Sequence, residues 1–111
     1  MATAADVRKL ALSLEGTIEV PHADRSAFRV RRIYTTLAPD GLSINMDLTP
    51  DEQAFKVMMA PDTYSRIPNG WGLRGATTID LTKISEAELE SALRMAWEHG
   101  RSKDPIHKKK T

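Results

Sequence analysis

The spacing of hydrophobic residues predicts an amphipathic helix near each end of the chain. Thr3 and Asp6 form a capping pair, and the apolar residues that follow recur on one helical face: Val7, Leu10, Ala11 and Leu14. This pattern predicts a helix over roughly residues 4–15 that ends at Gly16. Near the other end, a second helix is predicted to begin at a Ser85–Glu88 capping box and to end at Gly100. Its apolar stripe consists of Leu89, Ala92, Leu93, Ala96 and Trp97.

Alternating hydrophobic and polar residues predict strands between these helices. The clearest pattern covers residues 42–48, where Leu42, Ile44, Met46 and Leu48 share one face and polar residues share the other. Such a strand is typical of an antiparallel sheet with one face open to water. Further strands are expected at residues 17–20, 27–30, 33–37, 64–67 and 77–81, with Pro21 ending the first and Arg31 and Arg32 at a tight reversal.

A third helix is predicted in the middle of the chain. It begins with Thr49 as the cap, Pro50 at the first helical position and Glu52 closing a capping box. Pro61 ends it, and its buried apolar face is expected to consist of Phe55, Met58 and Met59. Hairpin-linked strands with flanking helices predict an α+β fold in which an antiparallel sheet is covered on one face by helices.

Length and charge predict one domain with a short tail. Residues 1–100 form a single domain, and residues 101–111 form a basic tail that we expect to be disordered. The net charge of the whole chain is +1, which divides into about −3 for the domain and +4 for the tail. The sequence contains no cysteine and shows neither a membrane-spanning run nor a signal-peptide pattern. We therefore expect a cytoplasmic protein with no membrane partner.

The least generic segment is the glycine-rich stretch that surrounds Trp71 and Arg74. Gly70, Gly72 and Gly75 predict a shaped loop between two extended segments. Two interpretations of Trp71 stay open: it fills the end of the core, or it faces a ligand. Burial is favoured, because large aromatic side chains are usually buried.

Enzymatic chemistry is the least favoured class of function. No serine lies on a Gly-x-Ser-x-Gly turn, and His22, His99 and His107 lack the i, i+4 partners that paired metal ligands show. The glycine segment also lacks the lysine of a phosphate-binding loop. We expect no catalytic residue, no metal site and no cofactor.

A set of residues from different predicted elements suggests a binding site. Two or three cations beside an indole can hold an anionic or planar ligand. The candidates are His22, Ser26, Arg32, Lys56, Trp71 and Arg74. The favoured alternative is that the cations are scattered over the surface around one core tryptophan.

Several stretches, in this order and spacing, resemble a known family. They are Ala27–Val30, Ile33–Leu37, Leu48–Gln53 and above all Pro68–Gly75 followed by Thr78–Leu81. Through these residues the chain, from about Val7 to Gly100, resembles the MmcQ/YjbR-like family. The resemblance implies a compact α+β fold described as CyaY-like or double wing. It also implies that Pro21 and His22 match the family's Pro-His pair.

Two functions remain open as expectations. The resemblance implies DNA binding, a label that the family often carries by fold analogy; the cations for phosphates would be Arg29, Arg31, Arg32, Arg66 and Arg74, with Trp71 stacking on bases. The alternative is a small anionic ligand or a protein partner in a pocket beside Trp71, with His22 and Arg74 as polar lining. Both describe a non-enzymatic binding module, and neither defines an oligomeric state.

Overall fold

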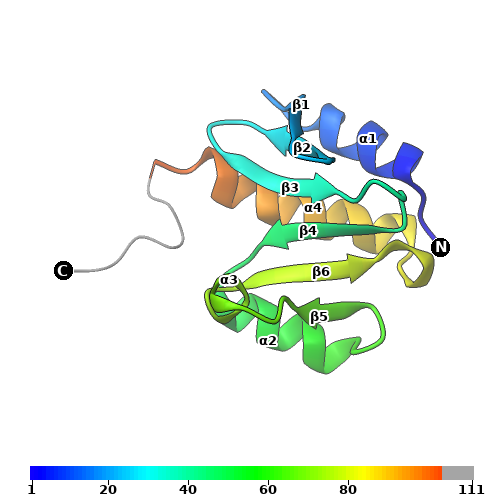
Figure 1. Cartoon of the computed structure of the whole chain (residues 1–111), viewed down its shortest axis with the longest axis vertical. Helices are drawn as coiled ribbons and strands as arrows, with labels where there is room; N and C mark the ends of the chain where they lie inside the picture. The colour runs from blue at the N-terminus through cyan, green and yellow to red at the C-terminus, as the bar shows by residue number, and fades with distance from the viewer. Residues whose placement is uncertain (104–111) are drawn as a thin grey trace.

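The computed structural model describes residues 1–103 as an α+β domain built on one antiparallel sheet (Figure 1). Its strands lie in the order β1-β2-β3-β4-β6-β5, and every neighbouring pair is antiparallel. The predicted fold class is therefore confirmed. The strands are β1 (Ile18–His22), β2 (Arg25–Arg29), β3 (Ile33–Leu37), β4 (Ser43–Asp47), β5 (Tyr64–Arg66) and β6 (Ala76–Asp80). The helices are α1 (Ala4–Ser13), α2 (Pro50–Met59), α3 (Gly70–Leu73) and α4 (Glu86–Arg101), with a 3₁₀ turn at Leu81–Lys83.

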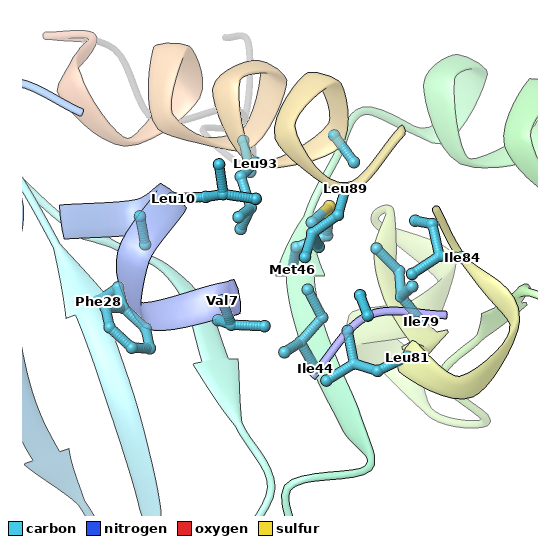
Figure 2. Packing of buried hydrophobic residues seen from close by; sticks show 14 of the residues in the cluster. Val7, Leu10, Phe28, Ile44, Met46, Ile79, Leu81, Ile84, Leu89 and Leu93 are labelled. Atoms are coloured by element: carbon cyan, nitrogen blue, oxygen red, sulfur yellow. The ribbon is translucent and has the colours of Figure 1, made fainter. Parts of the chain in front are cut away.

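Helices α1 and α4 cover one face of the sheet and form the core with it. Figure 1 shows α4 lying behind β3 and β4. In Figure 2, the side chains of Val7 and Leu10 from α1 and of Leu89 and Leu93 from α4 point toward β4. These four side chains are buried, as the apolar spacing of the two helices predicts.

The helix starts follow the predicted capping chemistry, with one difference. Thr3 with Asp6 and Thr49 with Glu52 both form complete capping boxes. At α4, the hydroxyl of Ser85 accepts from the backbone N–H of Glu88, but the carboxylate of Glu88 hydrogen-bonds to Lys56 and Tyr64. The Ser85 cap is therefore half of the predicted box, because a tertiary contact uses the acid.

Two strand boundaries differ from the prediction. Strand β1 continues through Pro21 to His22, because Pro21 lies in an edge strand, where a missing N–H is tolerated. The expected connector is instead a tight hairpin, with Ala23 at φ 58°. Leu42, expected in the core, is exposed because β4 begins only at Ser43.

Helix α2 presents the opposite face from the one predicted. Phe55, Met58 and Met59 are exposed, whereas Gln53 and Lys56 are buried. The polar pair faces inward because its partners lie there: Gln53 bonds to carbonyl groups around α3, and Lys56 pairs with Glu88. The inward face of α2 therefore combines side-chain hydrogen bonds with Val57 and Ala60, which pack against the core.

Candidate functional site

The uncovered face of the sheet carries a row of small polar side chains. Thr36, Asn45, Thr78 and Ser65 are neighbours across β3, β4, β6 and β5. The hydroxyl of Thr78 donates to Asn45 Oδ1 at 2.7 Å, and Arg25 Nε donates to Thr36 Oγ1 at 2.9 Å. This row is the wet face that the alternation in residues 42–48 predicts.

A hollow of about 340 Å³ lies on this uncovered face. Its floor comes from β3 and β4, and the end of β1 and the chain leading into α3 contribute to its walls. We call it the Trp71 hollow. The polar and aromatic side chains that line it include His22, Thr36, Asn45, Asp47, Asn69 and Trp71.

Trp71 lies in this hollow and not in the core. The residue is 59% exposed, so the favoured interpretation of a core tryptophan is wrong. The core cluster, which α1 and α4 form with the sheet, does not include Trp71. The guanidinium of Arg74 lies 5.5 Å from the centre of the indole ring, a distance at which the cation and the ring attract each other.

The short helix α3 that carries Trp71 is held by several specific contacts. Asn69 Oδ1 accepts from the backbone N–H groups of Trp71 and Gly72 at 2.9 and 3.2 Å. From below, the amide of the buried Gln53 donates to the carbonyls of Gly72 and Ala76, both at 2.9 Å. These bonds fix the backbone on both sides of the indole.

Two of the three glycines are required by close approaches of the backbone. A Cβ at Gly72 would lie 1.6 Å from the carbonyl oxygen of Ile67. A Cβ at Gly75 would lie 1.9 Å from the carbonyl oxygen of Leu48, and Gly75 also has φ +115°. Gly70, by contrast, has open space where a Cβ would stand. The segment is therefore a tightly packed support for Trp71 rather than a mobile loop.

The structure brings together only part of the candidate constellation. His22, at the end of β1, lines the Trp71 hollow together with Trp71, whereas Arg74 lines a separate recess that also includes Trp71. Ser26 lies in β2 beside Leu37 and does not line the Trp71 hollow. Arg29 is exposed on β2, outside the residues that line the hollow.

Arg32 and Lys56 have structural partners instead of facing a ligand. The guanidinium of Arg32 donates to the carbonyls of His99, Ser102 and Lys103, and so closes the end of α4. The carbonyls at a helix C-terminus lack partners within the helix, which makes a cation favourable there. Helix α4 accordingly runs to Arg101, one residue past the predicted end, and residues 104–111 of the predicted tail lie outside the described part of the chain.

Lys56 belongs to a cluster with Glu88 and Tyr64 between α2, α4 and β5. Lys56 Nζ lies 3.0 Å from Glu88 Oε2, and the hydroxyl of Tyr64 donates to the same oxygen at 2.7 Å. Burial and the neighbouring Glu88 carboxylate raise the pKa of Tyr64. Burial alone would raise the pKa of Glu88, but the hydrogen bonds from Tyr64 and Lys56 outweigh it, and the pKa of Glu88 is lowered.

A second hollow lies on the same face toward the opposite ends of β4 and β6. Its volume is about 560 Å³, and Asp40, Asp62 and Asp80 are among its lining residues. Hydrogen bonds from the hydroxyl and backbone N–H of Thr82 lower the pKa of Asp80. We call it the acidic hollow. The uncovered face therefore has an aromatic end and an acidic end.

Four polar residues of the site were not identified from the sequence. Asn45 and Asp47 appeared there only as members of a polar strand face, while Asn69 and Gln53 were given no role. The alternation in residues 42–48 could have identified Asn45 and Asp47, because it placed both side chains on the open face of the sheet. Gln53 gave a weaker signal: Gln53, Lys56, Val57 and Ala60 also have the spacing of one helical face.

No family model matches the sequence, and no curated protein matches it. Among solved structures, the fold is similar to the crystal structure of Deinococcus radiodurans protein DR2400, whose family-model domain is DUF419. The TM-score is 0.74 at 18% sequence identity, and the match covers 87% of this chain and 77% of that chain. A likeness at this identity supports the fold and does not transfer a function.

Within residues 1–103, none of the helices combines the length and the apolar character that crossing a membrane requires.

Proposed function

We propose that this protein is a non-enzymatic binding module that holds a flat heterocyclic ring against Trp71 in the Trp71 hollow. The observation that carries the proposal is an exposed tryptophan on a rigid support. Trp71 is 59% exposed, and each Å² of apolar surface that a ligand buries stabilises a complex by about 25 cal/mol. Binding of a second flat ring would gain part of that stabilisation.

The support of α3 favours binding because the indole is already positioned. Ordering a side chain and its loop during association costs roughly 0.5–1.5 kcal/mol per immobilised side chain. Here the Asn69 cap and the two Gln53 hydrogen bonds hold the backbone of α3 without a ligand. A ring that stacks on Trp71 therefore meets a surface that needs little rearrangement.

A base in a single-stranded nucleic acid is one source of such a ring, and a free nucleoside is the other. Arg74 beside Trp71 favours the strand, since stacking next to an arginine that can pair with a phosphate is the usual combination in single-strand binding. The acidic hollow at the other end of the face opposes a long phosphate backbone. We therefore infer contact with a short stretch of strand rather than with a duplex.

Membership in the MmcQ/YjbR-like family is part of the same proposal. DUF419 is a YjbR/MmcQ-like family, and the similar fold of the DR2400 protein is consistent with the resemblance of Pro68–Gly75. The label of DNA binding in that family rests on fold analogy. It is therefore consistent with a nucleic-acid ligand but is not independent evidence for one. A cytoplasmic location belongs to the proposal as well.

The two tryptophans allow a direct test by fluorescence. Trp97 is half-buried, and its Nε1 donates to the carbonyl of Glu15 at 2.9 Å, so Trp97→Phe leaves Trp71 as the sole emitter. Oligo-dT, oligo-dA, a duplex of equal length and free adenosine would be titrated into this variant. We expect single strands or the nucleoside to quench the fluorescence of Trp71. Quenching by the oligonucleotides alone would indicate a base within a strand, and quenching by adenosine alone would indicate a free nucleoside.

The matched control is Trp71→Phe, in which Trp97 alone emits and no quenching is expected. Trp71→Ala should abolish binding while changing the free energy of unfolding by no more than about 0.5 kcal/mol, because the side chain is exposed. Unchanged Trp71 emission with every oligonucleotide and with adenosine would overturn the proposal.

A further inference from the structure

The outer face of α2 carries three large apolar side chains that are more than half exposed within residues 1–103. Phe55, Met58 and Met59 are 56%, 68% and 65% exposed. Their i, i+3, i+4 spacing places them together on one face of the helix. Figure 1 shows α2 beside β5, at the edge of the sheet. We call these three side chains the Phe55 stripe.

The Phe55 stripe has the composition of an interaction surface. Exposed apolar side chains that gather in one place mark such surfaces, whereas single exposed ones are ordinary. Two of the three are methionines, whose flexible side chains adapt to the shape of a partner. None of the three lines the Trp71 hollow, so the stripe is separate from the site of the proposed function.

The charges of α2 indicate which kind of partner fits the stripe. Asp51 and Glu52 lie in the first turn of the helix, and its single cation, Lys56, pairs with Glu88 on the inner side. Glu52 is also engaged, since it closes the capping box and bonds to His99. The exposed Asp51 has no side-chain partner among the described residues. The outer side of this turn therefore attracts a positive charge.

The other end of α2 attracts cations as well. The carbonyls of Val57, Met58 and Met59 accept no hydrogen bond from the part of the chain that the structure describes, and Pro61, just beyond them, has no N–H to give. Helix α4 shows how this protein closes such an end, because the guanidinium of Arg32 donates to its last carbonyls. A cation from a partner can do the same at α2.

These charges oppose the other occupants of an apolar helix face. In a symmetric pair of copies, antiparallel packing of α2 on α2 places the acidic first turn of one helix beside the negative C-terminal end of the other. The only cation of the helix, Lys56, is paired on the inner side and cannot offset this repulsion. A helix that lies on a membrane carries lysine or arginine on its polar face, and the outer side of α2 carries neither.

We propose that the Phe55 stripe is a docking surface for a basic amphipathic helix of a partner protein. The apolar face of the partner packs on the stripe, one of its cations pairs with Asp51, and another donates to the carbonyls at the end of α2. Asp51 and Met59 are eight positions apart, a rise of about 12 Å, so the two cations of the partner lie about two helical turns apart. This inference goes beyond the proposed function and does not rest on it.

A matched pair of helical peptides tests the charge of the partner. The basic peptide has leucines on one helical face and lysines flanking them, and the acidic peptide has glutamate in place of every lysine. Each would be labelled with a fluorophore and titrated with the full chain, with fluorescence anisotropy as the readout. We expect the basic peptide to bind at least about tenfold more tightly, the factor that a difference of 1.4 kcal/mol produces. Equal or tighter binding of the acidic peptide, or no binding of the basic one, would overturn the inference.

A pair of apolar substitutions tests whether the basic peptide binds on the stripe. Phe55→Ala should weaken its binding at least about tenfold, because a large aromatic anchor is lost. The matched control is Leu12→Ala, which removes an exposed apolar side chain from α1 and should leave the affinity unchanged. Circular dichroism would show that both variants keep the fold. An unchanged affinity in Phe55→Ala, or an equal loss in Leu12→Ala, would overturn the assignment to the stripe.

A pair of charge substitutions tests the role of the first turn. Asp51→Asn should weaken binding of the basic peptide about two- to fivefold, the range that an exposed ion pair produces. The same change at the exposed Asp24, in the hairpin between β1 and β2, should have no effect. Equal effects of the two substitutions would contradict pairing with Asp51.

Two further measurements address the other occupants. Sedimentation equilibrium of the full chain should give no dimer that depends on Phe55, and a dimer that Phe55→Ala dissociates would replace the partner helix with a second copy. Vesicles of phosphatidylcholine and phosphatidylglycerol should not bind the chain, and binding that Phe55→Ala abolishes would replace it with a membrane surface. The quenching of Trp71 by oligonucleotides or adenosine is measured at a different site, so failure of either proposal leaves the other standing.

Discussion

Helices α4 and α2 follow opposite rules for what they bury. Helix α4 buries Leu89, Ala92, Leu93 and Ala96, as its apolar stripe predicts. Helix α2 turns Gln53 and Lys56 inward and leaves Phe55 in solvent. The difference teaches that a helix can turn inward the polar side chains that have hydrogen-bond partners there, even where its apolar residues form a plausible stripe.

The largest effect should come from the inner face of α4. Leu93 is completely buried, so Leu93→Ala should lower the free energy of unfolding by about 2–5 kcal/mol through lost burial and a cavity. Urea denaturation followed by circular dichroism measures it. A loss below 1 kcal/mol, as an order-of-magnitude limit, would show that α4 does not anchor the core.

A smaller loss is expected on the inner face of α2. Gln53→Leu keeps a similar volume but removes the side-chain N–H donors to the carbonyls of Gly72 and Ala76, which keep only their backbone donors. We expect a loss of about 1–3 kcal/mol in unfolding free energy and a changed Trp71 emission in the Trp97→Phe background. If Gln53→Leu were stabilising and left the emission unchanged, packing rather than hydrogen bonding would orient α2.

The contact between the two helices should make stability depend on pH. The pKa of Glu88 is lowered in the folded state, so Glu88 contributes stability above its unfolded-state pKa of about 4.3. This contribution is lost as the pH falls through the lower folded-state value. The stability difference between the native chain and Glu88→Gln should therefore shrink from about pH 6 to about pH 3. A difference that stays constant over this range would contradict the role of the Glu88 charge.

The smallest effect is expected on the outer face of α2. Phe55 is 56% exposed, so Phe55→Ala should change the unfolding free energy by no more than about 0.5 kcal/mol. Thermal or urea melting beside Leu93→Ala gives the direct contrast. A loss as large as that of Leu93→Ala would mean that α2 buries its apolar stripe after all, and the comparison would fail.

The sequence predicted those parts of the fold that repeat a periodic pattern. The stripes of α1 and α4 and the alternation of β4 were sufficient for the α+β class and for the open face of the sheet. The helix α2 was predicted correctly, but its buried face and the burial of Trp71 were predicted wrongly, because both depend on contacts between residues distant in the chain. Gln53 and Gly72, for example, are 19 positions apart in the chain and are joined by a side-chain hydrogen bond that no local pattern contains.

The residues of the candidate site could be predicted in part from the sequence, but their contacts with distant residues could not. The residue types His22, Trp71 and Arg74 were recognised, and the structure places the first two in one hollow. The roles of Arg32 and Lys56 depended on which carbonyl or carboxylate each one meets after folding. The tertiary structure decides whether a cation in the sequence is solvated, binds a ligand or pairs with the protein itself.

The two edges of the sheet have a consequence for how the molecules behave at high concentration. Strand β1 is one edge, and Pro21 within it has no N–H to offer to a strand from another molecule. Strand β5, the other edge, is only three residues long and carries Arg66. Both edges are poor templates for further strand addition, so the sheet resists growing into intermolecular β-aggregates.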